Sequence, residues 1–347
     1  MSDTSEAVSP ENDKVFRLSR QTEKTFPRVI GDVGGTNARF AIEISPGVFS
    51  ALASYANRNF ASFEAALRFY LSRPESVSAG SSTLQYAAIA IANPIDGDQI
   101  KMTNSEWTFS LSRVQEAFGF QVFLLVNDFT ALAMALPFLP RQCIRQWGGK
   151  ERLENRVIGL IGAGTGLGVS GLVPSSHGWI PLETEGGHVS FSPFDELEVK
   201  IWQRARKQLG HVSAERLLSG RGLELLYRLV AEIEDRAVDP LMAHQITERA
   251  LRKTCDLCDL TVEIFCRMLG TVSGNLALTL GAKGGLYIGG GIVPRLKERF
   301  FESGFRKRFE EKGRFSAYLA SIPVFVVTDS YAAFGGVSLL LDNYLKR

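Results

Sequence analysis

The sequence predicts an α/β protein with two lobes. Short apolar runs alternate with segments of helical periodicity, and one glycine-rich strand-turn-strand segment occurs twice. A chain of 347 residues is also long enough for about two domains, each with its own core. Strands that alternate with helices are typical of layered α/β architectures.

The repeated segment covers residues 29–42 and again residues 160–173, at an offset of 131 residues. Each copy reads as an apolar strand, a glycine-rich turn and a second strand. Two pairs of glycines coincide, Gly31 with Gly162 and Gly35 with Gly166. Because glycine lets backbone N–H groups approach a ligand without a side chain between them, the repeat predicts a duplicated clamp for an anion.

The remaining elements follow from periodicity. Apolar runs predict strands at 86–92, 122–126, 285–288 and 324–327. Helical patterns cover 63–71, 130–138, 194–209, 247–269 and 332–345. We expect the last helix to return to the first lobe, so that 28–138 with 329–347 form a small domain and 139–328 a large one. Residues 1–27, polar and without an apolar run, are predicted to be a flexible tail.

The composition restricts the possible partners. A net charge of +2 without a Lys/Arg-rich run argues against nucleic acid or an anionic membrane as a partner. No apolar stretch is long enough to span a bilayer. Four cysteines suit a reducing compartment, which predicts a cytoplasmic protein. Cys255 and Cys258 have the spacing of a metal-binding pair, but no second pair completes a site, so buried helix residues are favoured.

The first hairpin combines small residues with a carboxylate and a hydroxyl. Its predicted phosphate-binding residues are Gly31, Asp32, Val33, Gly34, Gly35 and Thr36. Backbone donors and the Thr36 hydroxyl suit phosphoryl oxygens, and Asp32 can hold Mg²⁺ directly or through water. An ordinary hairpin is the alternative, since such turns often contain Gly and Asn.

The second copy contributes Gly164, Thr165 and Gly166 to the predicted phosphate site. It lacks the spacing of a dinucleotide fingerprint and leads into a strand instead of a helix. The chain also has no Gly-Lys-Ser/Thr for a Walker loop. These absences argue against a Rossmann dehydrogenase and a P-loop NTPase.

Asn127 and Asp128 follow the apolar run 122–126 and precede a helical pattern. The carboxyl ends of strands are where α/β proteins usually bind ligands, so we favour a functional Asp128. The alternative is that Asp128 caps the next helix, and both can hold.

Two further side chains could bind neighbouring hydroxyls of a sugar, since Glu185 and His188 flank a flexible glycine pair. The alternatives are a core histidine and a surface glutamate. Glu215 stands at the start of a predicted helix, and the sequence alone indicates a helix-terminus residue favoured by the dipole. Gly289 and Gly290 follow a strand, where a flat backbone could accept an adenine ring or simply turn into a helix.

Taken in order, GDVGGTNARF, TNSEW, LVNDFTALA, GAGTGLGV, EGGHVSF, GHVSAERLLSG and GGLYIGGGIVPR resemble the bacterial glucokinase family, within the actin-like ATPase and hexokinase superfamily. The resemblance spans about residues 28–347. It implies a ribonuclease H-like fold of a small and a larger α/β domain around a cleft that holds ATP, and commonly a homodimer. The absence of a Cys-x-Cys-x-x-Cys motif separates the chain from the related zinc-containing sugar kinases.

The resemblance also implies roles. Asp128 is the implied catalytic base, and the implied sugar ligands are Asn104, Asn127, Asp128, Glu185, His188 and Glu215. The implied reaction, with Mg²⁺ as cofactor, transfers the γ-phosphoryl group of ATP to the 6-hydroxyl of glucose. A kinase for another hexose, a sugar sensor without turnover and an actin-like or chaperone ATPase are the alternatives. The pair Asp32 and Asp128 argues against a sensor, and the sugar-directed set argues against the last alternative.

Overall fold

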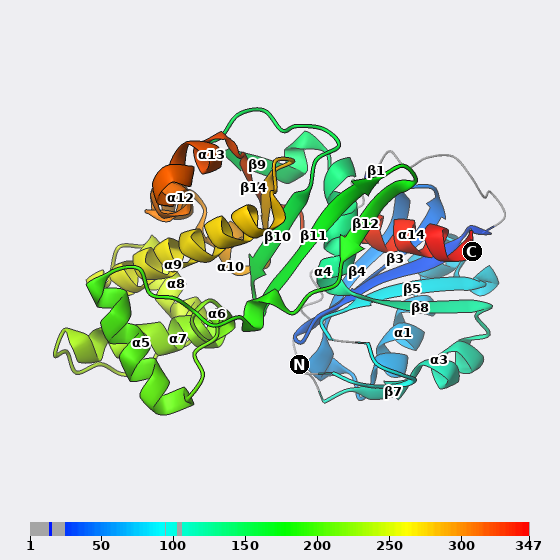
Figure 1. Ribbon diagram of the computed structural model, residues 1–347. Helices are drawn as coiled ribbons and strands as arrows, with labels where there is room; N and C mark the ends of the chain where they lie inside the picture. The colour runs from blue at the N-terminus through cyan, green and yellow to red at the C-terminus, as the bar shows by residue number, and fades with distance from the viewer. Residues whose placement is uncertain (1–13, 16–24, 94, 103–105, 347) are drawn as a thin grey trace. The chain divides into compact units, whose positions relative to one another are not determined.

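A computed structural model describes residues 14–15, 25–93, 95–102 and 106–346 (Figure 1). The chain divides into two compact units. Unit 1 comprises the described residues up to Pro140 together with 330–346, and unit 2 comprises residues 141–329. Among the described residues, every helix is too short or too polar to cross a lipid bilayer.

Unit 1 is built on a mixed sheet with the strand order β1-β4-β3-β2-β5-β8. Its strands are β1 (Lys14–Val15), β2 (Arg28–Val33), β3 (Asn37–Ser45), β4 (Val48–Ala56), β5 (Tyr86–Ile91) and β8 (Val122–Asn127), beside the separate pair β6 (Gln99–Lys101) and β7 (Thr108–Ser110). Strands β2, β5 and β8 are parallel, and β3 returns antiparallel to β2. Two residues of the predicted tail, Lys14 and Val15, pair with β4.

Helices cover both faces of this sheet (Figure 1). They are α1 (Phe63–Leu71), α2 (Pro74–Ser78), α3 (Leu111–Phe118), α4 (Asp128–Ala135) and α14 (Ala332–Leu345), with the 3-10 turns η2 (Asn57–Asn59), η3 (Ser81–Thr83) and η4 (Leu136–Phe138). Phe63 of α1 and Val114 of α3 are buried in the core of one face. On the other face, α14 crosses α4 so closely that a Cβ on Gly336 would lie 1.7 Å from the Ala131 carbonyl oxygen.

A buried polar network ties α14 to the start of β2. The fully buried Arg28 donates to Glu43 (2.6 Å), to Asp342 (2.6 Å) and to Ser338 (2.7 Å). Ser338 in turn donates to Glu43. Since a buried guanidinium is costly unless its donors are satisfied, this network requires the C-terminal helix to be in place.

Unit 2, with the order β12-β11-β10-β13-β14-β9, repeats five strands of this plan, and its sixth strand β9 joins the edge opposite to the one that β1 joins in unit 1. Its strands are β9 (Ile144–Trp147), β10 (Ile158–Ala163), β11 (Leu167–Ser175), β12 (Gly178–Leu182), β13 (Leu286–Gly289) and β14 (Val324–Val327). A hairpin (β10, β11) again leads to parallel strands (β13, β14), as β2 and β3 lead to β5 and β8. The shared strand plan agrees with the predicted duplication.

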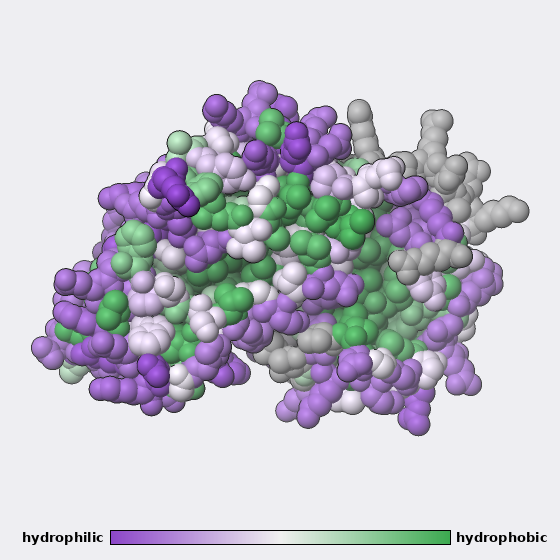
Figure 2. Space-filling view, in the orientation of Figure 1, coloured by the Kyte–Doolittle hydropathy of each residue, from purple (hydrophilic) through white to green (hydrophobic). Residues whose placement is uncertain are grey.

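The helices of unit 2 pack around α9, the longest in the described chain. They are α5 (Glu196–Leu209), α6 (Ala214–Leu217), α7 (Gly220–Ile233), α8 (Ala243–Leu251), α9 (Asp256–Leu280), α10 (Ile292–Leu296), α11 (Glu298–Phe301), α12 (Phe305–Glu310) and α13 (Ser316–Ser321), with η5 (Arg141–Cys143), η6 (Gly186–His188) and η7 (Gly313–Phe315). Phe265 and Leu269 of α9 are fully buried. Figure 2 shows polar residues over most of the outer surface of these helices, as expected when their apolar faces turn inward.

The predicted helix over 247–269 was wrong in one respect. The chain forms two helices there, α8 and α9, separated by a break in which Lys253 has a left-handed backbone (φ 55°). Cys255 is half-exposed and accepts the backbone N–H of Cys258 as the cap of α9. Cys258 and Cys266 are buried, as expected, and burial raises the pKa of each thiol to about 12.

Candidate active site

The first hairpin turns through Gly34, Gly35 and Thr36 between β2 and β3. Gly34 donates to the Asn37 carbonyl (2.9 Å), which closes the turn. The Asn57 amide donates to the Gly34 carbonyl (2.8 Å) and braces the turn from outside. The Thr36 side chain is exposed. The turn therefore presents a hydroxyl on a braced backbone.

Asp32 lies one strand position before this turn and opposite Arg39 on β3. The Arg39 guanidinium donates to Asp32 Oδ2 at 2.8 Å. Burial raises the pKa of the Asp32 carboxyl, and the charge of Arg39 acts in the opposite direction. Arg39 was not among the predicted site residues, because its pairing with Asp32 depends on the register that this turn sets.

Asn127 and Asp128 stand at the same edge of the unit 1 sheet as the first hairpin. Val33, Ile91 and Asn127 are in register across β2, β5 and β8, so the carboxyl ends of these strands are level. Asn127 Oδ1 accepts the N–H groups of Phe129 (3.0 Å) and Thr130 (3.1 Å).

Asn127 is therefore the cap of α4, and the alternative that Asp128 caps this helix is wrong. Asp128 is the first residue of the helix, is half-buried and accepts the Phe129 N–H at 2.9 Å. The cap leaves the amide nitrogen of Asn127 as the donor that this side chain can offer a ligand.

The second hairpin turns through Gly164, Thr165 and Gly166 between β10 and β11. Gly164 donates to the Gly166 carbonyl (2.8 Å), and its own carbonyl accepts the N–H of Gly220 (2.9 Å) at the start of α7. Thr165 is exposed, as its counterpart in the first hairpin is. Unlike the first hairpin, its strands carry no charged side chain.

The glycines at the end of β13 lie directly beside the second hairpin. Gly162 pairs with Gly289, and a Cβ on Gly162 would be 2.5 Å from the Gly289 carbonyl carbon. Gly290 has a left-handed backbone (φ 76°), and a Cβ there would be 2.3 Å from the Ala163 carbonyl oxygen. The segment also turns from β13 into α10, so the two interpretations of these glycines are compatible.

Glu185 precedes η6 and His188 is its last residue, and both are exposed, with side chains 66% and 60% accessible. The alternative that His188 is a core residue is therefore wrong. The two side chains approach to 3.9 Å, too far for a hydrogen bond but close enough to share one ligand. Between them, Gly187 is buried against the second hairpin, where a Cβ would be 2.0 Å from the Leu167 carbonyl oxygen.

Glu215 is half-buried in the first turn of α6, whose cap is Ser213. Its Oε2 accepts the backbone N–H of Leu167 at 2.9 Å, just after the turn of the second hairpin. Sequence reasoning missed this bond, because no local pattern relates residues so far apart. Asn104, the remaining predicted ligand, lies outside the described residues.

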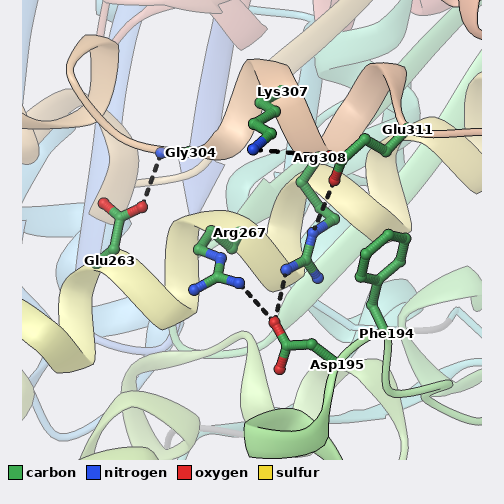
Figure 3. Close-up of a pocket in the computed structure, with 8 residues that line it drawn as sticks. All are labelled: Phe194, Asp195, Glu263, Arg267, Gly304, Lys307, Arg308 and Glu311. Atoms are coloured by element: carbon green, nitrogen blue, oxygen red, sulfur yellow. Dashed lines mark hydrogen bonds and ion pairs between the residues drawn. The ribbon is translucent and has the colours of Figure 1, made fainter.

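Unit 2 also contains a cavity of about 480 Å³ (Figure 3). Its lining residues are Phe194, Asp195, Glu263, Arg267, Gly304, Lys307, Arg308 and Glu311. Arg267 and Arg308 both donate to Asp195, at 2.5 and 2.9 Å, so the arginines are matched by carboxylates. None of the predicted site residues lines this cavity.

Comparisons with known proteins identify the relatives of the chain. Residues 29–344 match the family model described as Glucokinase. A glucokinase of Chromobacterium violaceum is 48% identical over 328 residues, which cover 94% of this chain and 93% of that protein. The crystal structure of a glucokinase from an Antarctic psychrotroph is 36% identical, with a TM-score of 0.79 over 91% of this chain and 98% of that one.

A ROK family glucokinase from Streptomyces griseus, solved in complex with glucose and AMPPNP, has a TM-score of 0.62 at 17% identity, over 91% of this chain and 99% of that one, and shows the fold alone. Together, fold and matches define a sugar kinase with the actin-like ATPase fold, which confirms the predicted fold class. The chain belongs to the glucokinase family. The prediction of an enzyme that phosphorylates glucose with ATP is thereby confirmed.

Proposed function

We propose that the side chains at the two hairpins and at the end of β8 carry out phosphoryl transfer from ATP to the 6-hydroxyl of glucose. The observation that carries this proposal is the shared sheet edge of unit 1. There the turn at Gly34–Thr36 and the carboxylate of Asp128 follow strands whose ends are in register. A phosphate-binding turn and a proton acceptor at one edge are what phosphoryl transfer to a hydroxyl requires.

Asp128 acts as the general base. It accepts the proton of the sugar hydroxyl as the oxygen attacks the γ-phosphorus, and the bond from that phosphorus to the bridging oxygen breaks to release ADP. Its position at the start of α4 is fixed by the Asn127 cap. Because Asn127 uses its carbonyl oxygen in the cap, it contributes its amide N–H₂ to the sugar.

The two hairpins bind the phosphates through backbone N–H groups and through the exposed hydroxyls of Thr36 and Thr165. Gly31, Asp32, Val33, Gly34 and Gly35 form the first loop, and Gly164, Thr165 and Gly166 form the second. Gly289 and Gly290 lie against the second hairpin, where their backbone would contact the adenine ring of ATP. AMPPNP, bound by the S. griseus relative, is an analogue of ATP.

Mg²⁺ fits the donor set at the first hairpin. This ion is commonly held by one carboxylate together with substrate phosphates and water, and Asp32 supplies that carboxylate. Arg39 already donates to Asp32 Oδ2, so contact through a water molecule suits this side chain better than direct ligation. When bound, the ion would neutralise charge that develops on the phosphates.

Glu185, His188 and Glu215 bind the sugar hydroxyls, together with Asn104. The exposure of Glu185 and His188 and their separation of 3.9 Å suit two neighbouring hydroxyls of one ring. Carboxylates make stronger hydrogen bonds to hydroxyls than neutral groups do, which favours this set over an ordinary polar surface.

The test is a coupled assay with ATP, Mg²⁺ and a panel of hexoses. We expect turnover with glucose, weaker turnover with mannose, fructose and N-acetylhexosamines, and none above background with galactose or without Mg²⁺. Equal turnover with another hexose would reject strict glucose specificity. Sugar binding without turnover would favour a sensor and reject the kinase mechanism.

We further propose that the enzyme works in the cytoplasm, at the entry of glucose into glycolysis, and as a homodimer. The near-neutral net charge of +2 supports small-molecule substrates rather than nucleic acid or membranes as partners. Analytical ultracentrifugation tests the homodimer: a single species at the mass of one chain, over the working concentration range, would reject it.

A further inference from the structure

The backbone of Leu167, the first residue of β11, lies where the second hairpin meets the sugar-directed residues of unit 2. Its N–H donates to Glu215 Oε2 at 2.9 Å. Its carbonyl oxygen lies against Gly187, at the point where a Cβ would be only 2.0 Å away. Both backbone polar groups of Leu167 are thus covered by segments assigned to the sugar, and this residue follows the turn assigned to the phosphates.

The short helix α6, which carries Glu215, is fixed at its N-terminus by hydrogen bonds. Ser213 caps this helix, with Oγ 3.3 Å from the Arg216 nitrogen. Ala214 donates to the Val189 carbonyl (2.9 Å), which joins this helix to the segment that contains Glu185 and His188. The carboxylate also packs on the turn itself, since a Cβ on Gly166 would be 2.5 Å from Oε2.

The two oxygens of Glu215 have different surroundings. Oε2 is engaged by Leu167, whereas Oε1 has no protein partner in the part of the chain that the structure describes. The side chain is half-buried, so one edge remains open to a ligand. A carboxylate in this position can accept a sugar hydroxyl and a hairpin N–H at the same time.

We propose that Glu215 is a positioning residue for the nucleotide hairpin as well as a sugar ligand, and that it couples the two substrates through the backbone N–H of Leu167. This inference rests on the proposed function of the hairpin and of Glu215. A sugar on Oε1 restricts rotation of the carboxylate, which strengthens its hold on Leu167 and orders the turn before the phosphates arrive. By linkage, bound nucleotide must raise sugar affinity by the same factor.

Glu185 is the matched control. It is another carboxylate of the proposed sugar set, and among the described residues its side chain approaches His188, 3.9 Å away, and makes no hydrogen bond to the hairpin. Replacing it should affect sugar binding alone. The two glutamates therefore separate the loss of a sugar ligand from the loss of a hairpin contact.

The experiment measures AMPPNP affinity by calorimetry, with Mg²⁺, in the presence and absence of glucose. Without glucose, Glu215→Ala should bind AMPPNP about tenfold more weakly than the unsubstituted enzyme, the factor of one net hydrogen bond. The AMPPNP affinity of Glu185→Ala should stay within twofold of that of the unsubstituted enzyme. Glu215→Gln keeps an acceptor for Leu167 and should restore most of the sugar-free nucleotide affinity while glucose binding stays weak.

Unchanged sugar-free AMPPNP affinity in Glu215→Ala would overturn the proposal. Unchanged glucose affinity in that variant would instead reject the proposed sugar role and leave the hairpin contact standing. A measurement on the unsubstituted enzyme avoids any folding defect: glucose alone should slow hydrogen exchange at the Leu167 amide severalfold. Exchange that glucose does not change would also overturn the coupling.

Discussion

The two hairpins share one strand plan but are held in place by different means. The first carries its own charges, with Asp32 and Arg39 paired across its strands. The second has no charged residue from β10 to β11 and takes a carboxylate from Glu215 on a separate helix. A duplicated turn can therefore keep its backbone geometry while the source of its electrostatics changes.

The two hairpins also differ in how closely neighbouring atoms pack against their glycines. The first turn has room, since a Cβ on Gly34 would meet nothing nearer than the Asn37 carbonyl oxygen at 3.8 Å. The strands of the second hairpin are enclosed by backbone: a Cβ on Gly162, Gly187 or Gly290 would lie 2.0–2.5 Å from a carbonyl atom, whereas a Cβ on Gly31, the counterpart of Gly162, would meet the Ile89 side chain. The first hairpin depends on charge and the second on close approach, so different substitutions should damage them.

The largest effect is expected at the sheet edge of the first hairpin. Asp128→Asn should reduce kcat by about 10²–10⁴, because it removes the proton acceptor and keeps the shape of the side chain. Glucose affinity and melting temperature should change little. Steady-state kinetics and a thermal melt check this, with Glu116→Gln, an exposed site on α3, as the control. Near-normal turnover would exclude Asp128 as the base.

A second prediction contrasts the packing of the two hairpins. Gly187→Ala places a Cβ 2.0 Å from the Leu167 carbonyl oxygen, so it should cost about 1–3 kcal/mol of folding free energy. It should also weaken the binding of both glucose and ATP. Gly34→Ala should cost less than about 0.5 kcal/mol, in keeping with an open site. Denaturant melts of both variants measure the difference, and equal stability would refute the contrast in packing.

The smallest effect is a shift in pH dependence at the first hairpin. Burial raises the pKa of Asp32 and Arg39 opposes it, so Arg39→Gln should raise that pKa further. If the ionised carboxylate is the active form, the acid limb of kcat/KM moves to higher pH. Arg39→Lys, which keeps the positive charge, should lie nearer the unsubstituted profile.

The raised pKa of Asp32 also determines how the free energy of unfolding depends on pH. A carboxyl whose folded pKa exceeds its unfolded value binds more protons when folded, so its contribution falls as pH rises from the ordinary value through the raised one. Arg39→Gln should steepen that fall. Coincident acid limbs for Arg39→Gln and the unsubstituted enzyme would show that Arg39 does not set the ionisation of Asp32.

Much of the fold could be predicted because its signals are local. The helix at 63–71 and the strand at 324–327 occur with the predicted bounds, since periodicity and flanking caps fix such elements. The break before α9 was missed because the apolar pattern continues through the residue that caps the helix. For the candidate site, the hairpins and Asp128 stand out in the sequence.

The contacts of Glu215 with Leu167 and of Gly187 with the same residue did not stand out. They arise from tertiary packing between segments 20–48 residues apart along the chain. The pairing of Asp32 with Arg39 could be predicted in part. It follows from hairpin register once the turn is known, but not from composition.

The dependence of unit 1 on α14 has a consequence for the order of events during synthesis. Residues 141–329 form a continuous stretch and leave the ribosome as a complete unit. Until the last residues emerge, Arg28 and Glu43 lack Ser338, and Arg28 also lacks Asp342. Since domains generally fold as their residues emerge, the second unit can finish first although it comes later in the sequence. The unit that carries Asp128 must wait until α14 has been synthesised.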